Sequence, residues 1–397
     1  MRVLDAKLKP EISLPEDSER STLVGRVWLP PEVGPSVVSI RDGVIYDISA
    51  SAPTITDLIN SDDPLEHVSG GKALGELEVI LANSAFDLRE SGTPWLLAPV
   101  DLQPVKASGV TFAASLLERV IEEQAGGDKA KADTIREEVV GIIGADLGEI
   151  QPGSEMALQL KERLIERGAW SQYLEVGIGP DAEVFTKAAP LSSVGTGSEV
   201  GVLEESEWNN PEPELAIFAN AQGEIVGVSL ANDVNLRDIE GRSALLLGKA
   251  KDNNAACAIG PFLRLFDDSF NIDHARQAVI GLEVVGSDGF ELRGESSLEL
   301  ISRDITDLMG QTIGGHHHYP DGVVLLSGTM FAPTQDRGAP GQGFTHHIGD
   351  IVSISSPLLG TLVNRVNLAH EVEPWAFGIR SLMTSLHHRG LLDGSGS

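Results

Sequence analysis

The sequence is poor in cysteine, in basic residues and in long apolar runs. Cys257 is the single cysteine of the 397 residues, so no disulfide can form within the chain, and a reducing compartment is favoured. The N-terminal segment carries charges where a signal peptide needs an apolar core. No apolar run approaches membrane-spanning length. We therefore expect a cytoplasmic protein that is not embedded in a membrane.

Basic residues are too few to balance the acids. The chain has 59 acidic and 29 basic residues, a formal net charge of −30. Such a surface repels phosphate backbones and anionic lipid headgroups, so nucleic acids and membranes are not expected partners. The length and a hydrophobic content of 41% suit one large domain or two smaller ones.

The chain divides by its hydrophobic pattern. Residues 22 to 100 alternate short apolar stretches with Pro and Gly breaks, and Asp42-Gly43 is typical of a tight hairpin turn. The stretch 54 to 68 predicts a short helix capped by Thr54 or Thr56. We interpret residues 1–100 as an N-terminal β-rich domain and residues 101–397 as the catalytic domain. Three- and four-residue spacing of apolar residues predicts a helical insertion at about 119–170, and a final helix is predicted near residues 382–392.

Two glutamates in "WNNPEPELAIF" are the first sign of chemistry. Glu212 and Glu214 share a face if this segment is a strand. The following residues read as a hairpin with a two-residue Gln222-Gly223 loop, which pairs Glu212 with Asp233. Three carboxylates then converge at one end of the hairpin, where a hard cation such as Mg²⁺, Mn²⁺ or Ca²⁺ would offset their repulsion. The alternative is a set of exposed strand charges on an acidic protein.

The two faces of this hairpin differ in residue size. Small residues follow the acids on their face, whereas large apolar residues occupy the other. We expect the second face to build core and the first to leave space for a ligand beside the metal. The small residues are Ala216, Gly227, Ser229 and Ala231, and the large ones are Leu215, Ile217, Val226, Val228 and Leu230.

The segments "EPELAIF", "GVSLANDVNLRDIEGR", "LLLGKAKDNNAACAIGPF", "GVVLLSGTMFAP" and "IGDIVSISSPLLGTLVNRV" together resemble the fumarylacetoacetate hydrolase superfamily, over roughly residues 95 to 395. The resemblance implies an α+β, mostly β fold, a mixed β-sandwich roll, here with the β-rich N-terminal domain and the helical insertion. It also implies that Glu212, Glu214 and Asp233 bind Mg²⁺. Lys249 matches the superfamily's active-site lysine.

The same resemblance indicates where a substrate would bind. Thr329 matches a threonine that holds the substrate carboxylate, and Lys187 matches a second basic residue. Ser115, Arg237 and Gln335 complete the candidate substrate-binding residues. Hydrolases of the superfamily carry a His and a Glu on a lid helix, but the segment "GVTFAASLLE" has Ser115 at the histidine position and retains Glu118. Without an imidazole, general-base activation of water is disfavoured.

Longer stretches, including "LLAPVDLQPVKASGVTFA" and "WSQYLEVGIGPDAEVFTK", resemble a longer branch of the superfamily, the 2-keto-3-deoxy-pentonate dehydratases. This branch implies dehydration of 2-keto-3-deoxy-D-xylonate, the same compound as 2-keto-3-deoxy-D-arabinonate, to 2,5-dioxopentanoate. Glu118 would protonate the departing hydroxyl, and Lys249 or a water held by Glu118 would remove the C3 proton. Related enzymes imply a homodimer or a dimer of dimers.

Two other functions stay open at this point. One is a C–C bond hydrolase or decarboxylase of an acylpyruvate-like diketo acid, which would release two fragments. The other is a non-catalytic protein stabilised by a bound cation, which would change its melting temperature on metal removal without any turnover.

Overall fold

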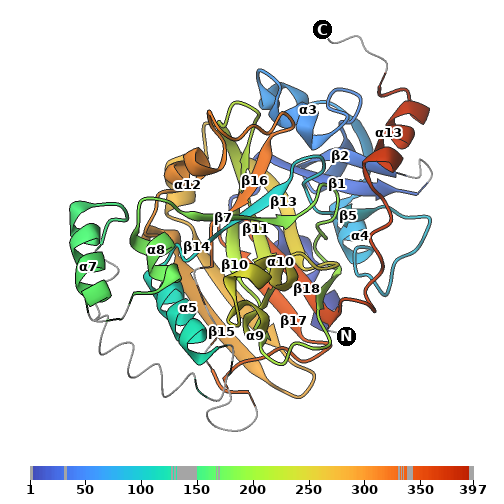
Figure 1. Cartoon of the computed structure of the whole chain (residues 1–397). Coiled ribbons are helices and arrows are strands. Elements are labelled where there is room, and N and C mark those ends of the chain that lie inside the picture. Colours follow the sequence, from blue (N-terminus) through green and yellow to red (C-terminus); the bar gives the residue numbers. More distant parts are fainter. Residues whose placement is uncertain are drawn as a thin grey trace.

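The computed structural model describes residues 3–30, 34–126, 128, 131, 150–166, 168, 170–329, 331, 333, 335–337 and 343–392. Residues 132–149 of the predicted helical insertion at about 119–170 lie outside these residues. The described part confirms a mixed α+β protein in which strands predominate (Figure 1). Within it, no helix combines the length and the apolar character needed to cross a bilayer.

The larger sheet has eleven strands in the order β4-β3-β2-β1-β13-β11-β10-β16-β6-β7, with β5 added beside β1. Its strands are β1 (Leu23–Leu29), β2 (Gly34–Arg41), β3 (Val44–Asp47), β4 (Lys72–Glu76), β5 (Trp95–Leu97), β6 (Val105–Gly109), β7 (Glu183–Ala188), β10 (Pro213–Ala219), β11 (Ile225–Asp233), β13 (Cys257–Leu265) and β16 (Val323–Leu326). The sheet is mixed, because β16 and β6 run parallel whereas the other pairs are antiparallel.

A second sheet of five strands packs against the first, in the order β15-β14-β17-β18-β8. Its strands are β8 (Glu199–Val202), β14 (Val279–Val285), β15 (Glu291–Ser297), β17 (Ile351–Ser356) and β18 (Gly360–Leu368). The main hydrophobic core lies between the two sheets and joins Leu215, Val228 and Leu230 to Leu282, Ile354 and other buried residues of the smaller sheet. This is the packing of a β-sandwich. A two-stranded ribbon, β9 (Asn209–Asn210) with β12 (Asn235–Leu236), lies beside the hairpin.

Short helices cover the sheet edges and the loops. They are α1 (Val3–Lys7), α2 (Pro10–Ser13), α3 (Ile55–Ile59), α4 (Leu77–Ala82), α5 (Ala113–Ala125), α7 (Glu155–Glu166), α8 (Gln172–Ile178), α9 (Arg237–Glu240), α10 (Leu247–Lys251), α11 (Ile272–Arg276), α12 (Ile305–Thr312) and α13 (Ile379–His388). Helices α5, α7 and α8 lie together at one side of the molecule (Figure 1) and share a small core of their own. They provide the helical character predicted for this region, and α13 confirms the final helix.

The N-terminal strands belong to the same sheet as the hairpin. Strand β1 pairs with β2 on one side and with β13 on the other, and β13 in turn pairs with β11. The proposed domain boundary near residue 100 therefore runs through a continuous sheet. The local predictions here are confirmed: Asp42 and Gly43 both have positive φ between β2 and β3, and Thr54 caps α3 through a capping box with Asp57.

The hairpin of β10 and β11 has the predicted register at the end that carries the acids, because Glu214 faces Ala231 and Pro213 faces Asn232. The predicted two-residue loop was wrong. The backbone N–H of Asn220 donates to the carbonyl of Glu224, so three residues form the loop, and Gly223 has a φ of +84°. A bulge between Phe218 and Ala219, where the partner changes from Gly227 to Ile225, compensates for the extra residue and restores the register.

The small-residue face of this hairpin was expected to leave space in front of the acids. Away from the acids this face is buried, because Ala216, Phe218 and Ala231 belong to a second core that also contains Ile55 and Leu58 of α3. Small residues are needed there because this side of the sheet is covered closely, so the sheet is packed on both faces. The acids lie at the end of the hairpin beyond this packing.

Candidate metal centre and active site

Glu212, Glu214 and Asp233 converge as the strand register predicted. Glu214 is on β10, Glu212 directly precedes it, and Asp233 ends β11, where its N–H donates to the carbonyl of Glu212 at 3.0 Å. One carboxylate oxygen of each residue lies within 4.8 Å of the others. Their exposed fractions are 3%, 1% and 1%. The alternative that these acids are exposed charges on a surface strand is therefore wrong.

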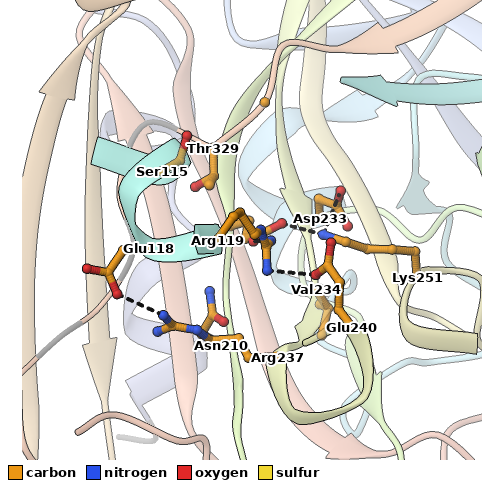
Figure 2. Close-up of polar contacts among 12 residues, drawn as sticks. Ser115, Glu118, Arg119, Asn210, Asp233, Val234, Arg237, Glu240, Lys251 and Thr329 are labelled. Atoms are coloured by element: carbon orange, nitrogen blue, oxygen red, sulfur yellow. Dashed lines mark hydrogen bonds and ion pairs between the residues drawn. The ribbon is translucent and has the colours of Figure 1, made fainter. Parts of the chain in front are cut away.

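Buried cations surround two of these acids. Lys251 Nζ lies 2.5 Å from Glu212 Oε2 and 3.2 Å from Asp233 Oδ2. Arg119 Nη2 donates to Glu212 Oε1 at 2.7 Å, and the other end of its guanidinium pairs with Glu240 at 2.7 Å (Figure 2). Such pairing is required, because an isolated charge away from water costs several kcal/mol.

Glu214 is the acid that the lysines do not reach. Its Oε2 accepts a hydrogen bond from the backbone N–H of Gly328 at 2.7 Å, and among the described residues no Lys or Arg nitrogen lies within 4.0 Å of its carboxylate. Burial and the neighbouring charges of Asp233 and Glu212 raise the pKa of Glu214 well above its usual range. Asp233 differs: burial opposes its ionisation, but Lys187 and Lys251 outweigh burial and lower its pKa.

Lys187 lies beside the acids, but it is not directed at a substrate site. Its Nζ lies 2.6 Å from Asp233 Oδ1 and donates to the carbonyls of Val234 at 3.0 Å and Lys251 at 2.7 Å. These three contacts use the three hydrogens of an ammonium group. In this structure Lys187 therefore fixes Asp233 and the end of α10, rather than offering a free donor to a substrate carboxylate.

Lys249 does not reach the site that was predicted for it. Its side chain is 48% exposed and pairs with Glu205 at 2.8 Å on the surface. Lys251, two residues further along α10, enters the acid cluster instead. A residue two positions along a helix points about 200° away, so only one of the two lysines can face the site. Burial alone would lower the pKa of Lys251, but Asp233 and Glu212 outweigh it and raise that pKa.

Glu118 and Arg237 form a second buried pair. Arg237 Nη2 donates to Glu118 Oε2 at 3.0 Å, and the guanidinium carbon lies 4.4 Å from the centre of the Trp208 ring (Figure 2). Glu118 is on α5 and Arg237 begins α9. Arg237 was predicted to bind the substrate. In the structure it contacts Glu118, the residue predicted to act as the general acid.

Ser115 and Thr329 lie close to each other in Figure 2, on the side of the site formed by α5. The Ser115 hydroxyl donates to the carbonyl of Phe112 at 2.9 Å, and the Thr329 hydroxyl donates to the carbonyl of Phe331 at 3.0 Å. Gln335 is not part of this group in the described contacts: its amide donates to the backbone carbonyl of Glu291 at 3.1 Å.

Three polar residues of the site were missed by the sequence reasoning: Lys251, Arg119 and Glu240. Helix periodicity could have found Arg119, because residues i, i+3 and i+4 share a face and Ser115, Glu118 and Arg119 have this spacing. The same rule marks Lys251, since Leu247, Ala250 and Lys251 form the inward face of α10, where Ala250 and Lys251 are buried. No sequence signal points to Glu240.

The arrangement combines two chemical capacities. Three buried carboxylates provide the oxygen ligands that Mg²⁺ prefers, and one of them lacks a cationic partner among the described residues. Beside them stand a carboxylate–guanidinium pair and two hydroxyl groups, which can move a proton and hold an oxygen of a small molecule.

No protein-family model matches the chain. Two curated proteins resemble it. The "2-dehydro-3-deoxy-D-arabinonate dehydratase" of Saccharolobus solfataricus is 31% identical over 190 residues, which are 48% of this chain and 60% of that protein. The "Probable 2-keto-3-deoxyxylonate dehydratase" of Haloferax volcanii is 30% identical over 286 residues, 72% of this chain and 91% of that protein.

Solved structures share the fold. A 2-keto-3-deoxy-D-arabinonate dehydratase complexed with magnesium and 2,5-dioxopentanoate superposes with a TM-score of 0.61 at 21% identity, over 87% of this chain and 99% of that one. A fumarylacetoacetate hydrolase from Exiguobacterium antarcticum has a TM-score of 0.55 at 17% identity, over 88% of this chain and 100% of that one. The predicted β-sandwich of this superfamily is confirmed.

Proposed function

Because the chain belongs to the 2-keto-3-deoxy-pentonate dehydratases of the fumarylacetoacetate hydrolase superfamily, we propose that it converts 2-keto-3-deoxy-D-xylonate to 2,5-dioxopentanoate and water. The relatives named above act on this class of substrate, and one solved neighbour holds magnesium and this product. The observation that carries the proposal is the buried triangle of Glu212, Glu214 and Asp233.

The residues present fit a divalent cation. All three candidate ligands are carboxylates, without Cys or His, and this donor set favours Mg²⁺, with Mn²⁺ or Ca²⁺ as possible substitutes. The geometry of Glu214 is the specific support, because its buried carboxylate faces Asp233 and Glu212, and no lysine or arginine of the described residues forms an ion pair with it. The charge of Lys251 offsets this repulsion only in part, and a bound cation would balance the rest.

The chemistry that Mg²⁺ supplies when bound is Lewis-acid polarisation of the C2 carbonyl, which makes the C3 protons more acidic. Lys251 holds a positive charge beside Glu212 and Asp233, where it can stabilise negative charge that develops on the C2 oxygen. Lys251 is thus proposed as the lysine of the site in place of Lys249, but with a stabilising role rather than the removal of the C3 proton first considered for Lys249.

Proton transfer falls to Glu118. Its carboxylate takes a proton from C3 and gives it to the departing C4 hydroxyl, which leaves as water, while a double bond forms between C3 and C4. A proton then leaves C5 and another adds to C3, which gives an enol with its double bond between C4 and C5. Loss of the hydroxyl proton at C5 and gain of a proton at C4 convert this enol to the aldehyde. Arg237 orients Glu118 through the ion pair at 3.0 Å. Since Lys249 is on the surface, a single group serving C3 and C4 is the simplest assignment.

Binding of the substrate carboxylate is assigned to hydroxyl groups. Thr329 and Ser115 are both buried, and each hydroxyl now donates to a backbone carbonyl nearby. Either hydroxyl can rotate to donate to a carboxylate oxygen instead. Lys187 contributes indirectly, by holding Asp233 in place.

The hydrolytic alternative has less support. Cleavage of a C–C bond needs a base that activates water, and Ser115 occupies the position where hydrolases carry histidine. The Ser115 hydroxyl is buried and donates a hydrogen bond to the backbone carbonyl of Phe112. A hydroxyl of this kind is a poor base at neutral pH.

The decisive experiment is incubation of the protein with Mg²⁺ and 2-keto-3-deoxy-D-xylonate, coupled to a semialdehyde dehydrogenase. We expect one product that retains all five carbons and carries an aldehyde. Release of two fragments would identify a hydrolase instead. A metal-dependent melting temperature without turnover of this substrate would identify a non-catalytic protein.

We propose three further assignments: a homodimer or a dimer of dimers, a cytoplasmic location, and a domain boundary near residue 100. Sedimentation velocity tests the first assignment, and fractionation of the cells that make the protein tests the second. Expression of residues 101–397 alone tests the third, although the pairing of β1 with β13 predicts that this fragment loses stability.

A further inference from the structure

A cavity separate from the acid triangle lies between the N-terminal strands and the C-terminal arm. We call it the aromatic cavity; its volume is about 460 Å³, within the range of small-molecule sites. Its lining comes from β1, β5, the segment 191–199 and the residues 372–377 that lead into α13. Five aromatic side chains contribute: Trp28, Phe86, Trp95, Trp375 and Phe377.

The aromatic rings form a platform and a cover. Trp28 and Trp95 face each other across paired strands, with centroids 5.9 Å apart and planes 21° apart, and Phe377 meets Trp28 edge-on at 5.1 Å. Trp375 is 49% exposed, and its indole N–H donates to the carbonyl of Phe377 at 2.9 Å. The chain leading into α13 thus passes over the strands that carry the platform (Figure 1).

One buried donor in the wall lacks a partner. Arg89 places its guanidinium 5.4 Å from the Trp95 ring, and its Nη2 donates to Ser198 Oγ at 3.1 Å. Its Nε is buried and has no hydrogen-bond partner among the described residues. A buried donor without an acceptor destabilises the folded protein, so an acceptor brought by a ligand would be favoured here.

Two other charged side chains of the cavity are already paired. Arg26 donates to the backbone carbonyls of Ala98 and Val100, and Glu199 accepts from Asn367 and pairs with Arg365. Glu373 also lines the cavity, and its negative charge acts on Arg89. Arg89 Nε and Ser193 Oγ are the buried lining atoms without a hydrogen-bond partner among the described residues, and of these two only Arg89 Nε is solely a donor.

We infer that the aromatic cavity is a second ligand site, which binds a planar aromatic molecule carrying a hydrogen-bond-accepting oxygen such as a carboxylate. The ring of the ligand stacks on the indole platform, and the oxygen accepts from Arg89 Nε. Trp375 closes over the outer face. Stacking on aromatic side chains adds to the gain from burying apolar area, which favours a flat ring over a saturated one.

The site lies behind the acid triangle rather than in it. Val194, part of its wall, donates to the carbonyl of Cys257 at 2.9 Å and accepts from the N–H of Ile259 at 3.0 Å. Cys257 in turn pairs with Asp233 across β13 and β11. None of the acids or lysines of the catalytic cluster lines the aromatic cavity.

Naphthoate is a suitable probe, with cyclohexanecarboxylate as the saturated comparison. Titration calorimetry on the full chain should show naphthoate binding and weaker binding of the saturated acid. Trp375→Ala and Arg89→Met should each weaken naphthoate binding by about 10-fold, the equivalent of ~1.4 kcal/mol. Leu245→Ala removes a side chain that is 95% exposed elsewhere and should leave binding unchanged. Equal binding of the two acids, or unchanged binding to both cavity variants, would overturn the inference.

A second measurement separates this site from the catalytic one. Naphthoate should bind Glu214→Gln as tightly as the unaltered protein, and pyruvate with Mg²⁺ should not displace it. Displacement by pyruvate would place naphthoate in the catalytic site and overturn the inference. The inference would also be overturned if sedimentation showed that a second copy of the chain fills the cavity, with naphthoate dissociating that dimer. The outcome does not depend on turnover of the proposed substrate.

Discussion

Lys251 Nζ lies 2.5 Å from Oε2 of Glu212, and both side chains are buried. This ion pair joins the last residue of α10 to the acid that precedes β10, two segments 39 residues apart. Asp233 receives the same ammonium at 3.2 Å, so Lys251 bridges two of the three candidate ligands. Its position makes it the lysine of the site, and Lys249 a surface residue.

The first prediction compares these two lysines. Lys251→Met should lower kcat by about 10²–10⁴-fold, because it removes the charge placed to stabilise the developing enolate while keeping an apolar stem of similar length. Lys249→Met should retain nearly full activity, since Lys249 contacts only Glu205 among the ion pairs described. Steady-state kinetics with the coupled aldehyde assay measures both.

Folding is the control for this pair of variants. Removing one partner of a buried ion pair can destabilise a protein by about 3–5 kcal/mol, so the melting temperature of Lys251→Met must be measured with and without Mg²⁺. A folded Lys251→Met protein with normal kcat would remove Lys251 from the mechanism.

The fold could be predicted from the sequence where local rules decide it. The Asp42-Gly43 turn, the Thr54 cap and the convergence of Glu212 with Asp233 follow from turn chemistry and strand alternation. The pairing of β1 with β13 could not be predicted, because it joins residues more than 200 positions apart and no local pattern encodes such a partner. Consequently the shared sheet was missed, and the N-terminal strands were assigned to a domain of their own.

The site could be predicted only in part, for a related reason. The acids were found because they lie on one hairpin, whose register can be counted. Lys251 was missed because two lysines lie close together in one short helix, and only the helix orientation distinguishes them. The loop of the hairpin was misjudged because Gln222-Gly223 favours a two-residue turn, whereas Gly223 takes its positive φ as the third loop residue. The bulge that corrects the register has no local signature.

The second prediction concerns metal binding. Glu214→Gln keeps an acceptor for the Gly328 N–H but removes the charge that faces Asp233 and Glu212. Without metal, we expect the variant to be at least as stable as the unaltered protein. A ligand at 100 times its Kd stabilises a protein by about 2.7 kcal/mol, and the variant should lose most of this gain on addition of Mg²⁺.

Differential scanning fluorimetry with EDTA and with increasing Mg²⁺ measures this change. Glu166→Gln, in the exposed part of α7, is the matched control and should keep the full response to Mg²⁺. An unchanged Mg²⁺ response in Glu214→Gln would show that Glu214 is not a ligand.

The third prediction tests the proton-transfer role of Glu118. Glu118→Gln preserves the size and one acceptor of the side chain, so the hydrogen bond from Arg237 can remain. Its amide cannot take a proton from C3, and we expect kcat to fall by about 10²–10⁴-fold. The stabilisation by Mg²⁺ should not change, because Glu118 is not one of the clustered acids.

Exchange of the C3 hydrogens in D2O, followed by NMR, locates the defect of this variant. Loss of both exchange and dehydration is expected if Glu118 serves both steps. Retained exchange with lost dehydration would limit Glu118 to the C4 hydroxyl and assign the C3 proton to another group. Near-normal turnover would remove Glu118 from the mechanism.

The fourth prediction concerns stability in acid. Asp350 precedes β17 and is buried; Arg337 Nη1 and Nη2 donate to its two oxygens at 2.5 and 2.8 Å, and His346 Nδ1 lies at 3.3 Å. Burial opposes ionisation of Asp350, but the bonds from His346 and Arg337 outweigh it and lower its pKa from 3.8 to about 2. A carboxyl group with a lowered pKa stabilises the folded state above its unfolded value, and this stabilisation is lost as the pH falls from about 4 to about 2.

Asp350→Asn should therefore be less stable than the unaltered protein at pH 7 by roughly 2 kcal/mol, the equivalent of the shift in pKa. The difference should shrink as the pH falls below about 4, because the unaltered protein then protonates Asp350 and loses the same interaction. Urea unfolding between pH 7 and pH 2.5 measures it. Burial lowers the pKa of His346, so protonation of His346 favours the unfolded state and removes stability as the pH falls below about 6.5. A stability difference that stays constant down to pH 2.5 would show that Arg337 does not hold Asp350 ionised.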